Sequence, residues 1–132
     1  MVLVDTSVLI GYLRGDEHAA VGRFQQILDR NIPFGISPLI YLEVLQGTKS
    51  EKDHATVKRY LETHRFFGLL DEKESYAAAA RIYFDCRRKG TTINSTIDCL
   101  IAQTAIENDL LLLHNDADFE RIRKVAPLKT YE

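Results

Sequence analysis

The chain has 132 residues, with 17 Lys and Arg against 19 Asp and Glu, so its formal net charge is −2. Its hydrophobic share of 45% and charged share of 27% are ordinary for a globular protein and exclude a disordered, collagen-like or low-complexity chain. A near-neutral chain is also a poor candidate for coating nucleic acid by charge alone, so any contact with nucleic acid should be local or assisted by a metal ion.

Apolar runs and helical patterns alternate through the first half of the chain. The pattern predicts a strand, two helices, a second strand and another helix, which cover residues 2–4, 8–14, 16–31, 34–36 and 38–46. Ser37 and Pro38 are typical of an N-cap followed by proline in the first helical position. Gly47 is a suitable end for the helix that they begin.

The second half continues the alternation. It predicts a helix, a strand, two helices, a strand, a short helix and an edge strand at residues 50–64, 66–70, 74–89, 95–105, 110–113, 119–125 and 128–131. The leucine run at 110–113 lacks polar alternation, as expected of a strand buried on both faces. The whole pattern predicts a single α/β domain over residues 1–132, a three-layer α/β/α sandwich around a mainly parallel sheet.

Neither a membrane segment nor an export signal is expected. The apolar runs fall far short of the ~20 residues that span a bilayer, and Met1–Asp5 contains no basic residue, so we expect a cytoplasmic protein without membrane contact. Cys86 and Cys99 lack a C-x-x-C spacing. We interpret them as reduced helix cysteines rather than a disulfide or zinc ligands.

Acidic residues gather where the predicted sheet would bind a ligand. Ligands of parallel α/β sheets bind beyond the carboxyl ends of the strands. Asp5 follows the first strand, and Asp116 and Asp118 follow the leucine strand. Glu43 and Asp98 lie on helices beside apolar neighbours, where a carboxylate is costly unless a cation or hydrogen bonds compensate it.

Each acid also has an ordinary structural explanation. Asp5 and Asp116 can cap the helices that follow them, Asp98 can complete a capping box with Ser95, and Glu43 can be a surface acid. Converging carboxylates, however, repel one another by about 1 to 4 kcal/mol per close pair, and a divalent cation would relieve this repulsion. Oxygen ligands favour Mg²⁺ or Mn²⁺, and the 4 histidines show no zinc-binding spacing.

Four segments give the chain a resemblance to a known family. They are Val4–Ile10 (VDTSVLI), Leu42–Gly47 (LEVLQG), Ile97–Ala102 (IDCLIA) and His114–Phe119 (HNDADF). Taken in order, they resemble the PIN-domain ribonucleases, and within them the VapC toxins of VapBC toxin–antitoxin pairs, over nearly the whole chain. The resemblance implies a PIN-like fold and a metal-dependent endoribonuclease, usually a homodimer, that a small VapB-type antitoxin holds inactive.

The resemblance also implies roles for individual residues. The catalytic acidic quartet would be Asp5, Glu43, Asp98 and Asp116. The metal would be held by Asp5, Asp98 and Asp116, with Asp118 as a further acid that faces the metal or supports its ligands. Thr6 or Ser7 would be a polar helper beside Asp5. Carboxylates of this kind hold one or two divalent ions that activate water for attack on a phosphate, so no side-chain nucleophile is needed.

The RNA substrate would approach the acids along basic side chains. The candidates are Arg87, Arg88 and Lys89, just before a predicted loop at residues 91–94. The alternative is that they are solvated side chains, which the helix dipole favours at a C-terminus.

Two other classes of function remain open from the residues alone. A receiver domain would use Asp71, after the strand at 66–70, as the acceptor of a phosphoryl group. That fold usually has an adjacent acidic pair after its first strand, whereas Thr6 follows Asp5 here. A PIN-like module that binds RNA or protein without catalysis is the other alternative, and the intact acidic quartet argues against it.

Overall fold

A computed structural model describes residues 1–132, which form four strands and seven helices. In chain order the elements are β1 (Val2–Val4), α1 (Thr6–Arg14), α2 (Ala19–Asp29), β2 (Phe34–Ile36), α3 (Pro38–Gln46), α4 (Glu51–Leu61), β3 (Arg65–Phe66), α5 (Glu74–Arg88), α6 (Thr96–Glu107), β4 (Leu111–Leu113) and α7 (Ala117–Arg123). None of the helices combines the length and the apolar character that a membrane span requires.

The four strands are parallel and lie in the order β3-β2-β1-β4. In the central strand β1, Val2 pairs with Phe34 of β2 on one side and with Leu111 of β4 on the other. The chain therefore extends the sheet from β1 through β2 to β3 and then returns to the opposite side of β1 for β4. The strand order switches between β1 and β4, and such a switch is where α/β sheets bind ligands.

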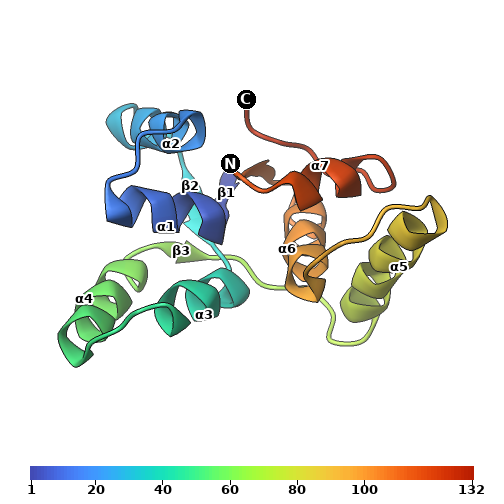
Figure 1. Ribbon diagram of the computed structural model, residues 1–132, viewed down its shortest axis with the longest axis horizontal. Coiled ribbons are helices and arrows are strands. Elements are labelled where there is room, and N and C mark those ends of the chain that lie inside the picture. Colours follow the sequence, from blue (N-terminus) through green and yellow to red (C-terminus); the bar gives the residue numbers. More distant parts are fainter.

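Helices cover both faces of the sheet, which confirms the predicted α/β/α sandwich. In Figure 1, α1 to α4 (blue to green) lie on one side of β1 and β4, and α5 to α7 (yellow to red) lie on the other. The switch in strand order explains this division, because right-handed crossovers that run in opposite directions along a sheet place their helices on opposite faces.

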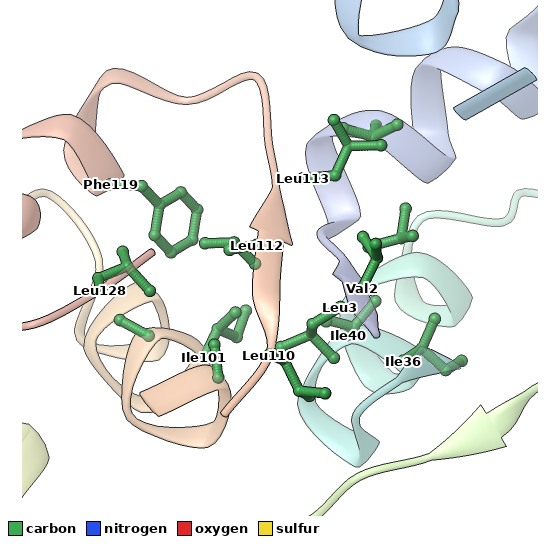
Figure 2. Packing of buried hydrophobic residues seen from close by; sticks show 14 of the residues in the cluster. Val2, Leu3, Ile36, Ile40, Ile101, Leu110, Leu112, Leu113, Phe119 and Leu128 are labelled. Atoms are coloured by element: carbon green, nitrogen blue, oxygen red, sulfur yellow. The ribbon is translucent and has the colours of Figure 1, made fainter. Parts of the chain in front are cut away.

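Strand β4 is buried on both faces, as its unbroken leucine run predicts. Leu112 points toward Phe119 and Leu128, whereas Leu113 points to the other side, toward α1 (Figure 2). Leu112 is 0% and Leu113 is 1% exposed. Burial of both faces fixes this strand firmly, and with it the polar loop that follows its carboxyl end.

Two predicted strands are shorter than expected. The strand predicted at 66–70 is limited to β3, because its neighbour β2 ends at Ile36 and Ser37 already caps α3. Beyond β3, only Phe67 N–H still bonds the sheet, at Ile36 O (2.8 Å). The predicted edge strand at 128–131 is reduced to a single bridge between Thr130 and Leu112, because β4 offers only three residues for pairing.

Helix boundaries shift where the capping residue differs from the predicted one. Helix α1 begins at Thr6 rather than at residue 8, because Asp5 is its N-cap. Helix α2 begins at Ala19 rather than at residue 16, because His18 Nδ1 accepts from Val21 N–H (3.3 Å). The predicted cap of α3 is confirmed, since Ser37 Oγ accepts from Ile40 N–H (3.2 Å).

Candidate metal centre at the carboxyl ends of β1 and β4

Asp5 follows β1 directly and is 3% exposed. Its Oδ2 accepts hydrogen bonds from the N–H of Ser7 (3.0 Å) and from Ser7 Oγ (2.6 Å). Its Oδ1 is buried and has no hydrogen-bond partner. Burial raises the pKa of Asp5 to about 6, although the hydrogen bonds from Ser7 act in the opposite direction. A buried carboxylate oxygen without a donor is costly, and a cation is one group that would satisfy it.

Glu43 joins this site from helix α3. One of its carboxylate oxygens accepts from Thr6 Oγ1 (2.7 Å), so the start of α1 is tied to α3 by two side chains. The negative charge of Glu43 also contributes to the raised pKa of Asp5. Thr6 and Ser7, the predicted polar helpers, therefore each hydrogen-bond one of the predicted acids.

Three further acids converge on the same edge of the sheet. Asp98, Asp116 and Asp118 can each offer an oxygen atom such that the three atoms lie within 4.8 Å of one another. Asp98 lies in the first turn of α6 and is 6% exposed, whereas Asp116 is the most accessible of the three. Burial, followed by the charges of Asp116, Asp5 and Asp118, raises the pKa of Asp98 to about 8. The contribution from Asp5 links this cluster electrostatically to the end of β1.

Asp116 and Asp118 have different hydrogen-bond environments. Asp116 is the N-cap of α7, and its Oδ1 accepts from Asp118 N–H (2.9 Å). Asp118 is 2% exposed, and both of its oxygens have donors: Asn94 N–H at 2.9 Å and the guanidinium of Arg121 at 2.6 Å. Asp118 thus anchors the loop before α6, and its charge is largely offset by Arg121.

Helix capping, the ordinary structural explanation for three of the acids, applies to Asp5 and Asp116 but not to Asp98. Asp5 and Asp116 are indeed N-caps, but each cap uses a single carboxylate oxygen and leaves the other for a different partner. Asp98 does not form the expected capping box, since Ser95 makes no side-chain hydrogen bond at the start of α6. A buried acid without a capping role needs another explanation, and a cation site supplies one.

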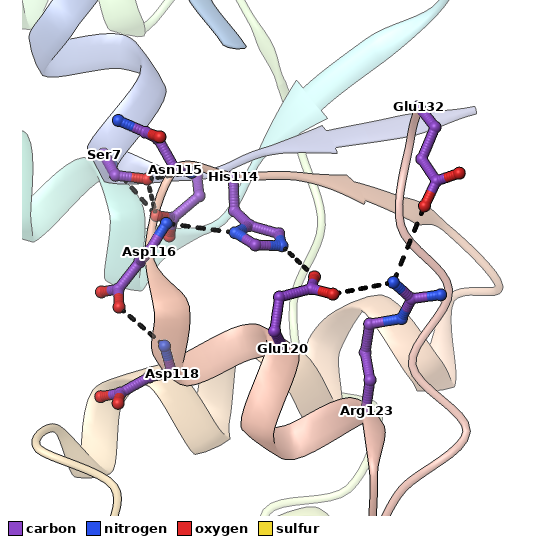
Figure 3. Close-up of polar contacts among 9 residues, drawn as sticks. Ser7, His114, Asn115, Asp116, Asp118, Glu120, Arg123 and Glu132 are labelled. Atoms are coloured by element: carbon purple, nitrogen blue, oxygen red, sulfur yellow. Dashed lines mark hydrogen bonds and ion pairs between the residues drawn. The ribbon is translucent and has the colours of Figure 1, made fainter. Parts of the chain in front are cut away.

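The loop after β4 contains two contacts that the sequence did not reveal. Ser7 Oγ accepts from the N–H of Asn115 (2.9 Å), so a single hydroxyl joins Asp5 to this loop. His114 Nδ1 accepts from the N–H of Asp116 (3.1 Å) (Figure 3). The only sequence signal for His114 was its position directly after a strand, at the edge where the acids gather.

The predicted basic residues lie at the end of α5, one loop away from the acids. Arg88 and Lys89 line a hollow of about 370 Å³ together with Lys124 at the end of α7. Arg87 does not line this hollow, and its guanidinium carbon lies 5.7 Å from the centroid of the Tyr83 ring. The loop from this hollow leads to Asn94, which contacts Asp118.

Asp71, the acceptor in the alternative receiver interpretation, has a structural role. Its Oδ1 accepts from the N–H groups of Lys73 and Glu74 at the start of α5. Its charge acts on Glu107, in the last turn of α6, whereas Asp98 lies in the first turn of that helix. Asp71 is therefore separated from the acidic cluster by the length of α6, which is contrary to the receiver interpretation.

Comparisons with known proteins agree with this architecture. The profile of the PIN domain family matches residues 2–125. A VapC ribonuclease of Mycobacterium bovis and ribonuclease VapC11 of Mycobacterium tuberculosis are each 32% identical to this chain over 130 residues, which are 98% of this chain and 96% of theirs.

Solved structures share the fold at lower identity. DNA-bound VapBC from Salmonella typhimurium contains a chain with a TM-score of 0.74 and 22% identity, over 98% of this chain and 96% of that one. A chain of VapBC2 from Rickettsia felis, bound to a promoter DNA fragment, has a TM-score of 0.73 and 19% identity, with 100% of both chains covered.

Proposed function

The chain belongs to the PIN-domain family and, within it, to the VapC ribonucleases, and from this premise we propose that it is a metal-dependent endoribonuclease and the toxin of a toxin–antitoxin pair. One observation carries the enzymatic part of the proposal. Asp5 Oδ1 is buried without a donor beside a cluster of further carboxylates, an arrangement that a divalent cation would stabilise.

The residues present fit such a cation. Asp5 contributes its unpartnered oxygen, and Asp98 and Asp116 contribute carboxylates without a cationic partner. We assign Asp118 a supporting role, because Arg121 and Asn94 already occupy its two oxygens. The donor set consists of carboxylate oxygens, so we propose Mg²⁺ or Mn²⁺ as the ion.

A bound divalent ion would supply an activated water and offset negative charge at the scissile phosphate. The protein's own residues prepare the site for it. Ser7 holds one oxygen of Asp5, so the other oxygen has a fixed direction. Glu43, held by Thr6, places a further carboxylate beside Asp5, and we propose that it accepts the proton of the attacking water. Asp98 must lose its proton before it can act as a ligand.

We propose that the RNA backbone is bound by the basic hollow at the ends of α5 and α7. Arg88, Lys89 and Lys124 line it, and its one acid, Asp85, is already paired with Arg81 at 3.0 Å. The hollow therefore has a net positive charge although the whole chain is slightly acidic. Arg87, which lies over Tyr83, would contact RNA beside this hollow.

We also propose two protein partners. A VapB-type antitoxin would block the acidic site, and a second copy of the chain would form a homodimer. Leu42 and Tyr76 are about half exposed and border a hollow of about 320 Å³ that a dimer contact could cover. Light scattering of the purified chain measures the oligomeric state directly.

The test of the enzymatic proposal is RNA cleavage by the purified protein with Mg²⁺, with Mn²⁺ and with excess EDTA. Cleavage should require the cation and should be lost in Asp98→Asn. Asp109→Asn is the matched control, because Asp109 is 86% exposed at its side chain and forms only a 3.4 Å ion pair with Lys129. Cleavage that persists in Asp98→Asn with EDTA would refute the proposed site. A protein that binds RNA but never cuts it would support the non-catalytic alternative.

A further inference from the structure

His114 lies between the acidic site and helix α7. It follows β4 directly, and its side chain is 11% exposed. The ring packs against Phe119 with the centroids 5.1 Å apart. Nδ1 faces the N–H of Asp116 at 3.1 Å, and Nε2 faces Oε2 of Glu120 at 2.9 Å (Figure 3). Both ring nitrogens therefore have a polar partner, and the ring itself has an aromatic one.

These two contacts select one tautomer of the neutral ring. Nδ1 accepts the hydrogen of the Asp116 amide, so it cannot carry a proton of its own. The ring proton therefore lies on Nε2, which donates to the carboxylate of Glu120. Glu120 is held in turn by Arg123 at 3.0 Å, and Arg123 also approaches Glu132 at 3.7 Å.

Asp116 is consequently held at two points. Its backbone N–H bonds His114, and its Oδ1 bonds the N–H of Asp118. These two bonds restrain the backbone and one carboxylate oxygen of Asp116 within the cluster that also contains Asp98. Without the bond to His114, the amide of Asp116 would have no acceptor and the loop could turn the carboxylate away.

We infer that His114 is a positioning residue of the metal centre: its Nε2–H tautomer, selected by Glu120, orients Asp116 toward the other carboxylates. This inference rests on the proposed function, because it assigns His114 a role toward the same cation. Removal of a group that hydrogen-bonds a metal ligand, without touching the metal itself, typically weakens metal binding by about 10- to 100-fold.

Two substitutions of His114 separate its contact with the Asp116 amide from its contact with Glu120. His114→Asn places an amide oxygen as many bonds from Cα as Nδ1 is, so it can still accept from the Asp116 amide. His114→Gln places its amide group at the level of Nε2, so it can reach Glu120 but leaves the Asp116 amide without an acceptor. Both substitutions remove the aromatic contact with Phe119, so the loss of that contact does not distinguish them.

The measurement is the dissociation constant for Mn²⁺, by calorimetry or electron paramagnetic resonance. His114→Gln should bind Mn²⁺ about 10- to 100-fold more weakly than the wild type, and His114→Asn should stay within about threefold. The RNA-cleavage kcat should follow the same order while KM for RNA changes little. Equal losses in both variants, or wild-type affinity in His114→Gln, would overturn the inference.

A second measurement needs neither metal nor RNA. The ¹⁵N shifts of the His114 ring in the metal-free protein should show a protonated Nε2 and an unprotonated Nδ1. Glu120→Ala, at a half-exposed position, should mix the tautomers and weaken Mn²⁺ binding in the same protein. A protonated Nδ1 in the wild type would overturn the inference alone. A wild type that binds no Mn²⁺ would overturn the proposed function, and this inference with it.

Discussion

Ser7 Oγ lies 2.6 Å from Asp5 Oδ2 and at the same time accepts the N–H of Asn115 at 2.9 Å. One hydroxyl therefore joins the end of β1 to the loop after β4, although these segments are more than a hundred residues apart in the chain. Asp5 comes from the first of these segments and Asp116 from the second, so the Ser7 hydroxyl ties these two acids of the site together.

Ser7→Ala should destabilise the protein by about 1 to 3 kcal/mol, because the Asn115 amide loses its acceptor and Asp5 loses a donor. The midpoint of urea denaturation measures this loss. Metal binding should also weaken, since Asp5 is less firmly held. Ser7→Thr keeps the hydroxyl and should restore most of both properties. If Ser7→Ala matches the wild type in stability and in Mn²⁺ affinity, the hydroxyl does not join the two segments.

Asp98→Asn should have opposite effects on activity and on metal-free stability. Loss of one ligand should lower the rate of RNA cleavage at least about 100-fold. The metal-free protein should be equally or more stable near neutral pH, because Asp98 must take up a proton on folding or keep a buried charge that faces Asp5, Asp116 and Asp118, whereas Asn needs neither.

The stabilisation of each protein by Mg²⁺ provides the control for the prediction on Asp98→Asn. A hundredfold excess over Kd should stabilise the wild type by about 2.7 kcal/mol and Asp98→Asn by less. Melting curves at constant ionic strength measure both shifts, with Asp109→Asn expected to behave as the wild type. An equal Mg²⁺ shift in the wild type and Asp98→Asn would remove Asp98 from the site.

The raised pKa values of Asp5 (about 6) and Asp98 (about 8) predict how stability depends on pH. Both groups have pKa values near 3.8 when unfolded, so between about pH 4 and pH 8 the folded protein binds more protons than the unfolded one. The stability that these groups contribute is therefore complete at low pH and is lost as the pH rises toward 8.

Denaturation of the metal-free protein at pH 5, 6.5 and 8 tests this sign. The wild type should lose stability over this range relative to Asp98→Asn, in which one of the two groups cannot titrate. Mg²⁺ binding should strengthen over the same range, because the cation competes with these protons. A difference between the two proteins that stays constant with pH would show that Asp98 is not protonated in the fold.

Much of the site follows from position in the sequence, because the ends of parallel strands meet at one edge. That rule predicts Asp5, Asp116 and Asp118 at this edge, and the leucine pattern correctly identifies β4. The rule does not predict the pairing of Asp118 with Arg121 and Asn94, which depends on how α7 packs beside the loop at 91–94. It also could not assign a role to His114, because the tautomer depends on Glu120, which approaches it only through the turn into α7.

The predicted strands that turned out too long also reflect contacts between distant parts of the chain. Residues 66–70 are apolar enough to form a strand, but a strand also needs a neighbouring strand of equal length to pair with. β2 ends at Ile36, so the chain beyond Phe67 leaves the sheet, and Leu70 N–H bonds the side chain of Glu107 instead (2.9 Å). Pairing partners are a property of the assembled sheet, which local sequence does not contain.

Neutralising the basic hollow should weaken RNA binding without changing the chemical step. Arg88→Ala combined with Lys124→Ala should raise KM and leave kcat nearly unchanged. The salt dependence of RNA affinity should also become shallower, by about 0.7 in the logarithmic slope for each lost phosphate contact to a single strand. The control is Lys58→Ala, because Lys58 lies on α4 and is paired with Glu62 at 2.7 Å. If the salt dependence of RNA affinity is unchanged in the double variant, RNA does not bind at this hollow.

Expression of the wild-type chain alone should arrest growth, and Asp98→Asn should be harmless at the same level of protein. Co-expression of the cognate partner should relieve the arrest.

The carboxylates of the acidic site would attract a guanidinium, which pairs favourably with carboxylates. Arg121 already pairs with Asp118 at the border of the site, through one contact of 2.6 Å. We therefore expect the partner to insert an Arg or another cation toward Asp5 and Asp116. Replacement of that cation by Ala should restore both Mn²⁺ binding and RNA cleavage in the purified complex. Harmless expression of the wild type, with no protein co-purifying, would refute the toxin assignment, whereas the cleavage assay would still decide whether the chain is a nuclease.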